Sequence, residues 1–200
     1  TLTNIGGTIT SRIQFGSYLL NELKLGRFIL TGGLRADWFA DKISKGGVPS
    51  FSGNAITYRL GGVYRITDEI SAYAQMANSF EPQSIGSQSP DFGGPFAPSK
   101  GKIVEGGIKT ALFNGRVQST AAVYQIKKTN VLQADPNGGP DDLIAFGEVT
   151  SEGAEFDVSA DLTKFWVVTA NYAFNNARVT QDAGGGDVDA SVNNRFANAP

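Results

Sequence analysis

The chain of 200 residues contains no cysteine and no histidine. Without cysteine there is no disulfide and no thiolate metal site, and without histidine the Ser-His and Cys-His catalytic pairs and the commonest zinc ligand are excluded. The formal net charge of −2 is too small to indicate a nucleic-acid partner. No run of about 18 apolar residues is present, which argues against a transmembrane helix.

What the chain does contain is typical of an all-β protein with many turns: 25 glycines, 13 phenylalanines and repeated two-residue alternation. In one example Val104 and Ile108 share a face opposite Glu105 and Lys109, ahead of Asn114-Gly115, a strong hairpin signal. Eight segments are predicted to be strands: 12–25, 27–40, 55–67, 70–81, 102–113, 116–130, 147–162 and 165–178.

The predicted connections alternate in length along the chain. Short turns are expected at Lys24–Arg27, Thr67–Glu69, Phe113–Gly115 and Thr163–Lys164, and long Gly/Pro/Asp-rich loops at 41–54, 82–101, 131–146 and 179–194. A soluble sandwich has no reason to sort its loops in this way, whereas a transmembrane barrel has short periplasmic turns and long extracellular loops. Trp38 and Trp166 lie where the two aromatic girdles of a barrel would be. The sequence therefore predicts an antiparallel transmembrane β-barrel segment.

Five motifs, in this order, carry a resemblance to a known family: "FILTGGLRADWF", "YRLGGVYRITDEISAYAQMANSFEPQ", "KGKIVEGGIKTALFNGRVQSTAAVYQIKKTNV", "GEVTSEGAEFDVSADLT" and "VVTANYAFNNARVT…NRFANAP". Together they resemble the barrel of TonB-dependent siderophore receptors, with the ferrichrome-like branch most similar. The resemblance implies a barrel of about 22 strands with a plugged lumen, of which residues 1–200 would supply about eight. The plug domain, the energy-coupling box and the terminal strand have no counterpart here, so we expect a segment of a longer protein.

The resemblance also implies which faces meet lipid and lumen. Val104, Ile108 and Leu112 would face lipid, with Glu105 and Lys109 toward the lumen. In the next strand we expect Ala122, Tyr124 and Ile126 to face lipid and Ser119, Gln125 and Lys127 to face the lumen. Glycine pairs recur within strands at Gly32-Gly33, Gly61-Gly62 and Gly106-Gly107, where they would permit strand bends or a close approach of the plug.

Binding is favoured over catalysis. The acid pairs Glu155/Asp157 and Asp141/Asp142 fit a lumen wall and a solvated loop, and no loop has the ligand spacing of a calcium site. A ferric siderophore brings its own iron ligands, so no cofactor or protein metal ligand is expected. The ligand would need aromatic surface and hydrogen-bond donors at the outer mouth, for which the candidates are Phe80, Gln83, Phe92 and Phe96, with Arg35 and Arg59 on the lumen wall.

The resemblance implies an outer-membrane receptor and transporter for ferric siderophores. Its partners would be the siderophore, outer-membrane lipid and the TonB complex, reached through the plug region. Two alternatives from other classes stay open on the sequence. One is a passive porin, or a TonB-dependent barrel for another cargo such as cobalamin or a glycan, and the other is a secreted all-β adhesion module.

Overall fold

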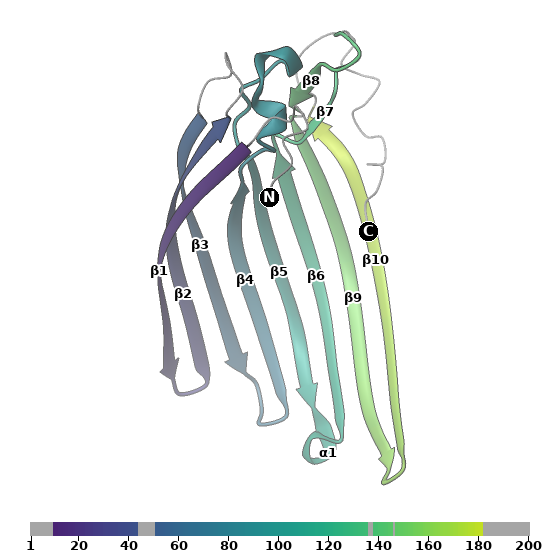
Figure 1. Ribbon diagram of the computed structural model, residues 1–200. Coiled ribbons are helices and arrows are strands. Elements are labelled where there is room, and N and C mark those ends of the chain that lie inside the picture. Colours follow the sequence, from purple (N-terminus) through teal and green to yellow (C-terminus); the bar gives the residue numbers. More distant parts are fainter. Residues whose placement is uncertain (1–9, 44–50, 136–137, 146, 182–200) are drawn as a thin grey trace, which may run out of the picture.

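The computed structural model describes residues 10–43, 51–135, 138–145 and 147–181. Long strands dominate it (Figure 1): β1 (Thr10–Leu25), β2 (Phe28–Ile43), β3 (Phe51–Arg65), β4 (Ile70–Glu81), β5 (Ser99–Ala111), β6 (Val117–Thr129), β9 (Glu148–Thr163) and β10 (Trp166–Gln181). The shorter elements are η1 (Gly86–Gln88), η2 (Pro90–Phe92), α1 (Leu112–Gly115), β7 (Leu132–Ala134) and β8 (Leu143–Ala145). All eight predicted strands are confirmed, with ends shifted by a few residues.

The eight long strands form one sheet in the order β1-β2-β3-β4-β5-β6-β9-β10, and every neighbouring pair is antiparallel. Strands of 12 to 16 residues are long enough to cross a bilayer when tilted. Within the described residues β1 and β10 each have a neighbour on one side only, so the sheet is open at both edges. Among the same residues, no helix is long and apolar enough to cross a membrane.

The connections are sorted by length, as predicted. The tight turns after β1, β3, β5 and β9 lie at one end of the sheet, and the long connections gather at the other (Figure 1). Gly26 takes a left-handed φ of 58° in the first turn, and in the second the Thr67 hydroxyl accepts hydrogen bonds from the backbone N–H groups of Glu69 and Ile70. Such local bonds hold a turn without help from a core.

The hairpin between β5 and β6 is confirmed, but its turn is larger than Asn114-Gly115 alone. Phe113, Asn114 and Gly115 all have positive φ, at 57°, 59° and 81°, and Leu112 bridges Val117 across the turn. The segment labelled α1 is therefore a left-handed turn that reverses the chain.

The long connections contain structure that the sequence did not predict. The 82–101 loop holds η1 and η2, and β5 begins inside its last residues. Within 131–146, β7 and β8 form a small hairpin. The 41–54 loop is shorter than predicted, because β2 extends to Ile43 and β3 begins at Phe51. The remainder of that loop, and the 179–194 loop beyond Gln181, lie outside the described residues.

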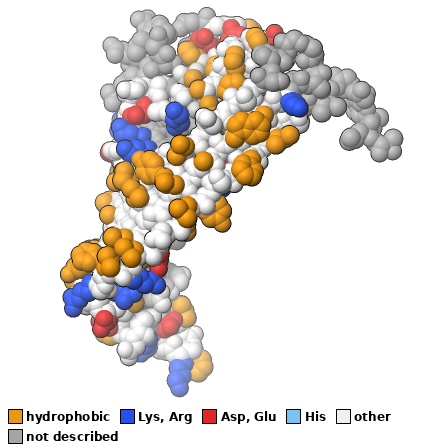
Figure 2. Space-filling model, turned by 90° about the vertical axis from the view of Figure 1, so that its left-hand side faces the viewer, with side chains coloured by type: hydrophobic (Ala, Val, Ile, Leu, Met, Phe, Trp, Pro, Cys, Tyr) orange, Lys and Arg blue, Asp and Glu red, His pale blue; other side chains and the backbone are white. Residues whose placement is uncertain are grey.

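The two faces of the sheet differ in chemistry. Residues paired across strands share a face, and the register places one set of exposed large hydrophobic side chains on the apolar face: Ile13, Phe15, Leu19, Leu34, Trp38, Ile56, Leu60, Val104, Ile108, Val123, Phe156, Tyr172 and Phe174. The opposite, polar face carries Gln14, Arg35, Asp37, Arg59, Tyr73, Glu105, Lys109, Tyr124, Glu155, Asp157 and Asn171. Figure 2 looks at the β1 side and shows hydrophobic side chains gathered over its middle. The buried core is correspondingly small, with Val149 and Val179 packed against Val131.

The predicted faces of β6 are wrong by one residue. The register pairs Tyr124 with Glu105 and Val123 with Gly106, so Tyr124 lies on the polar face and Val123, which is 64% exposed, lies on the apolar face. Ala122, Tyr124 and Ile126 are therefore polar-face residues, and Ser119, Gln125 and Lys127 are on the apolar face. The run Ser-Thr-Ala-Ala-Val-Tyr at 119–124 alternates too weakly in polarity to show its register, which the neighbouring strands determine instead.

Candidate ligand-binding surface

The buried side chain of Gln88 helps to hold the loop between β4 and β5. It is 1% exposed, and its amide oxygen accepts a hydrogen bond from the Phe96 N–H at 2.6 Å while its amide nitrogen donates to the Phe96 carbonyl at 3.1 Å. Gly93 has a left-handed φ of 82° and ends η2. Phe92 and Phe96, two of the predicted ligand residues, are both half-buried in this loop. Gln88 fixes the backbone that presents Phe96, and no sequence signal pointed to it.

Gln83, a third predicted ligand residue, joins this loop to the one after β6. Its amide nitrogen donates to the carbonyls of Asn130 at 2.6 Å and Ala97 at 3.2 Å. Asn130 in turn donates to the Pro98 carbonyl at 3.0 Å. Both hydrogens of the Gln83 amide are thus used by backbone acceptors, which gives this residue a structural role in the loop.

Arg12, a residue that the sequence did not single out, ties β1 and β2 to the same loop. Its guanidinium makes a two-pronged ion pair with Asp41 at 2.6 and 2.8 Å and donates to the Gln83 carbonyl at 2.7 Å. It also lies 5.7 Å from the ring centre of Phe39. Phe80, the fourth predicted aromatic or amide residue, packs in this cluster with its ring centre 6.2 Å from that of Phe39. A two-pronged arginine–carboxylate pair is strong and directional, so the loop is anchored at its β1 side.

The two predicted arginines both lie on the polar face, but their surroundings differ. Arg35 donates twice to the carboxylate of Asp37, at 2.6 and 2.7 Å, and Gln14 donates to the same carboxylate. Arg59 makes no hydrogen bond or ion pair with another described residue. Arg35 is therefore neutralised by the wall itself, whereas within the described part of the chain nothing occupies the donors of Arg59.

Arg59 lies in a groove of about 280 Å³ on the polar face. Across this groove the Tyr73 hydroxyl donates to Glu105 at 2.7 Å, and the Lys109 ammonium lies 4.9 Å from the Tyr73 ring centre. These groups can donate and accept hydrogen bonds and carry both charges, which suits contact with a polar molecule or segment.

Polar-face glycines make room for neighbouring side chains. A Cβ at Gly107 would overlap the Ala121 carbonyl oxygen and lie 2.8 Å from the Tyr73 ring, and one at Gly153 would overlap the Tyr124 phenol. At Gly106, on the apolar face, the nearest atom would be 3.5 Å away. The sequence suggested that the Gly106-Gly107 pair permits a strand bend or a close approach of the plug. For Gly107, close packing within the wall, which includes the Tyr73 ring, is a third explanation.

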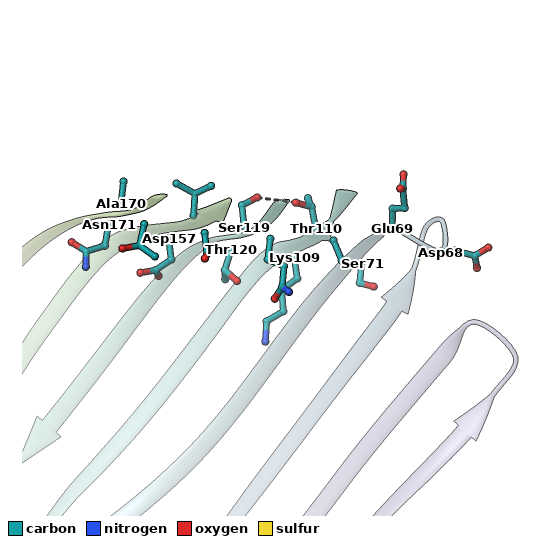
Figure 3. A pocket seen from close by; sticks show the side chains of 15 residues that line it. Asp68, Glu69, Ser71, Lys109, Thr110, Ser119, Thr120, Asp157, Ala170 and Asn171 are labelled. Atoms are coloured by element: carbon teal, nitrogen blue, oxygen red, sulfur yellow. Dashed lines mark hydrogen bonds between the residues drawn. The ribbon is translucent and has the colours of Figure 1, made fainter. Parts of the chain in front are cut away.

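Near the tight turns the wall is lined by small polar groups. Figure 3 shows Lys109, Thr120, Asp157 and Asn171 on one side of the ribbon, and the hydrogen-bonded pair Thr110 and Ser119 on the other, at 2.8 Å. The cavity there measures about 540 Å³ and extends to Asp68 and Glu69 on the turn. Asp157 pairs across the sheet with Asn171 and Thr120. This end of the sheet therefore presents hydrogen-bonding groups and charged side chains to a neighbouring molecule or segment.

Two curated relatives of the chain are a receptor and a transporter. The metal-pseudopaline receptor CntO of Pseudomonas aeruginosa is 35% identical over 128 residues, which cover 64% of this chain and 18% of the relative. The ferrichrome outer membrane transporter/phage receptor of Escherichia coli K12 is 33% identical over 173 residues, covering 84% of this chain and 22% of the relative. The chain thus spans about a fifth of the length of these two relatives.

A solved structure and a family model agree with the relatives. The alcaligin outer membrane receptor FauA of Bordetella pertussis superposes with a TM-score of 0.71 at 26% identity, covering 90% of this chain and 32% of that one. The family model described as "TonB dependent receptor-like, beta-barrel" matches residues 4–200. The chain belongs to the TonB-dependent receptor β-barrel family, whose members are outer-membrane proteins.

Proposed function

We propose that this chain forms adjacent wall strands of an outer-membrane barrel that takes up ferric siderophores with energy delivered through TonB. The observation that carries the proposal is similarity along most of the chain to the ferrichrome transporter, together with likeness to the alcaligin receptor structure. The metal-pseudopaline receptor extends the cargo to another metal chelate. The plug and the TonB-coupling segment would be supplied by parts of the protein beyond these 200 residues.

The geometry of the sheet fits this role. A barrel of this class has an apolar exterior and a polar interior, so the apolar face meets lipid and the polar face lines the lumen. The tight turns are then periplasmic, and the loop between β4 and β5 lies at the extracellular mouth. A ligand arriving from outside meets that loop before it reaches the Arg59 groove.

The extracellular end of the barrel offers the kind of surface that a ferric siderophore requires. Such a complex presents an organic exterior, so rings and donors recognise it. Phe92 and Phe96 are half-buried rings on a loop that Gln88 holds, and Arg59 is a cation without an internal partner among the described residues. We assign the ring contacts to Phe92 and Phe96 and the polar contact to Arg59. Phe80 and Gln83 support the loop from below.

Binding to the purified full-length receptor tests this assignment. Titrations, read by tryptophan fluorescence, would use ferric hydroxamate and pyoverdine siderophores, a metal–pseudopaline complex and, as non-siderophore cargo, cobalamin and a glycan. We expect one metal chelate to bind and the two non-siderophore cargoes to fail. Binding of cobalamin or the glycan alone would overturn the proposed cargo.

Loop variants then locate the site. Burying about 40 Å² of a ring at about 25 cal/mol per Å² contributes about 1 kcal/mol, so Phe92→Ala and Phe96→Ala should each weaken binding several-fold. Gln88→Leu keeps the volume but removes both bonds to Phe96, and should weaken binding without deleting a ring. Phe113→Ala is the matched control, because Phe113 is 68% exposed in a turn at the opposite end. Unchanged affinity in all three loop variants would restrict the loop to packing.

A further inference from the structure

The seam between β3 and β4 is paired along only part of its length. Backbone pairing joins residues 59–65 to residues 71–77, although β3 begins at Phe51 and β4 ends at Glu81. Each strand keeps its other neighbour to the loop end, because β3 pairs with β2 from Phe51 onward and β4 pairs with β5 up to Glu81. The wall therefore divides into two parts, β1–β3 and β4–β10, toward the end where the long loops lie.

One side chain replaces the backbone ladder where this pairing ends. The Asn78 amide oxygen accepts a hydrogen bond from the Tyr58 N–H at 2.6 Å, and the amide nitrogen donates to the Ile56 carbonyl at 3.2 Å. The amide thus satisfies two β3 backbone groups that lie beyond the paired segment. Because a rotation of this side chain breaks both bonds, the loop end of the seam can open without disrupting the ladder below it.

Further contacts reach across the same gap from β1 and β2. The Arg12 guanidinium of β1 donates to the Gln83 carbonyl at 2.7 Å, directly after β4. The Phe39 ring of β2 stacks on the Phe80 ring of β4, with 6.2 Å between ring centres. Gly53 of β3 leaves room for this contact, since a Cβ there would lie 2.8 Å from the Phe39 ring. The two parts of the wall are therefore joined here by side chains.

The turn at the other end of the seam is tied to both neighbouring hairpins. The Arg27 guanidinium, in the turn after β1, donates to the Ile66 carbonyl at 3.0 Å. On the other side the Ala111 N–H of β5 donates to the Glu69 carbonyl at 2.8 Å. Movement of the seam is therefore confined to its loop end.

We propose that the loop end of the β3–β4 seam is a clasp that opens and closes, with residues 59–65 as its hinge. In the closed state the side-chain contacts across the gap are made, and in the open state the loop ends of β3 and β4 lie further apart. The closing contacts are those of Arg12, Phe39, Asn78, Phe80 and Gln83.

The coupling of this clasp to cargo rests on the proposed function. Gln83 begins the loop that presents Phe92 and Phe96, and the closed clasp holds Gln83 through its carbonyl. A siderophore bound to this loop favours the closed clasp, because coupling between two sites is reciprocal. Cargo release and clasp opening are linked in the same way.

Distances between spin labels in the full-length receptor, without cargo, test the opening itself. Asn54→Cys with Glu152→Cys spans the separated part of the seam, and Leu60→Cys with Glu152→Cys spans the paired part. All three side chains are exposed on the apolar face, and the 200 residues contain no native cysteine. Double electron–electron resonance should show a second, longer distance for the first pair and a single distance for the second. Equally narrow distributions would overturn the clasp.

Hydrogen exchange tests the part played by Asn78. Asn78→Leu removes both bonds to β3, and a hydrogen bond contributes about two- to tenfold to an equilibrium, so exchange of the Tyr58 N–H should become about tenfold faster. The control, Gln125→Leu, removes a 2.7 Å side-chain bond to Glu152 between β6 and β9, which pair along all of β6. Tyr58 exchange that is unchanged by Asn78→Leu, or equally fast in both variants, would contradict the role of Asn78.

Added cargo tests the coupling. Ferrichrome, ferric pyoverdine and a metal–pseudopaline complex would each be added to the receptor labelled at 54 and 152, with cobalamin as the control. The chelate that binds should depopulate the longer distance, and cobalamin should leave it unchanged. Binding of a chelate without this shift would overturn the coupling but not the cargo. If no chelate binds, the proposed function fails, and the cargo-free distances still decide the clasp.

Discussion

Placing one arginine at either of two adjacent β6 positions decides the face assignment of the barrel. Val123 is the seventh of the 13 residues in β6, on the apolar face, whereas Ala122 points to the polar face. We predict that Val123→Arg strongly destabilises the full-length protein and that Ala122→Arg is tolerated. A reading of the sequence alone predicts the reverse.

The expected magnitudes follow from the surroundings of each residue. Arginine on the lipid side of a barrel costs about 2–4 kcal/mol at the bilayer midplane, and Val123 lies at the middle of its strand. Ala122 pairs across the sheet with Glu155, and a cross-strand pair of opposite charges contributes about 0.2–1 kcal/mol of stability. The two variants should therefore differ by at least about 2 kcal/mol in free energy of unfolding.

Equilibrium unfolding in guanidinium chloride, with the protein folded into phospholipid vesicles, measures this difference directly. Ala170→Arg and Asn171→Arg repeat the comparison on β10, where Ala170 shares the apolar face and Asn171 the polar face. Equal destabilisation at 122 and 123 would refute the register of β6, and the reversed order would restore the face that the sequence suggested.

Three further predictions concern packing, anchoring and the sheet edges. Gly107→Val should cost about 1–3 kcal/mol in the same unfolding assay, because the added carbon meets the Ala121 carbonyl oxygen and the Tyr73 ring. Gly106→Val should cost less, and equal costs would refute the close packing at Gly107. Arg12→Met should leave Asp41, 1% exposed, without its cation, costing about 3 kcal/mol and speeding hydrogen exchange in residues 82–98; Arg12→Lys should lose less, and unchanged exchange in Arg12→Met would contradict the anchoring. Residues 1–200 expressed alone should not form a heat-resistant monomer on gel electrophoresis, because β1 and β10 are open edges; a cooperatively folding monomer in plain buffer would contradict the membrane reading.

The strands and their connections were predictable because their signals are local. Alternation of Phe156 and Val158 with Glu155 and Asp157 shows the register of β9 without any neighbour. The sorting of loop lengths then distinguished a barrel from a sandwich, and the family model agrees with the barrel. In β6 small and polar residues stand on both faces around Val123, so the register depends on pairing with β5 and β9, which a single sequence does not show.

The candidate site was less predictable because it depends on contacts between distant segments. Gln88 is recognisable as the centre of its loop only once Phe96 is known to fold back onto it. Arg12 and Gln83 are separated by 71 residues in the chain and meet only in the folded sheet. The sequence indicated phenylalanines in the loops, and strand alternation indicated lumen-facing arginines, but neither could separate Arg35, which is paired with Asp37, from Arg59.

The central claim, TonB-driven uptake of a ferric siderophore, is tested most directly by transport in cells. The full-length protein would be expressed in an outer-membrane receptor-deficient strain with and without TonB, and accumulation of radioactive iron supplied as the siderophore that binds in vitro would be measured. We predict surface binding in both strains and accumulation only where TonB is present. Equal accumulation without TonB would indicate a passive pore and contradict the account.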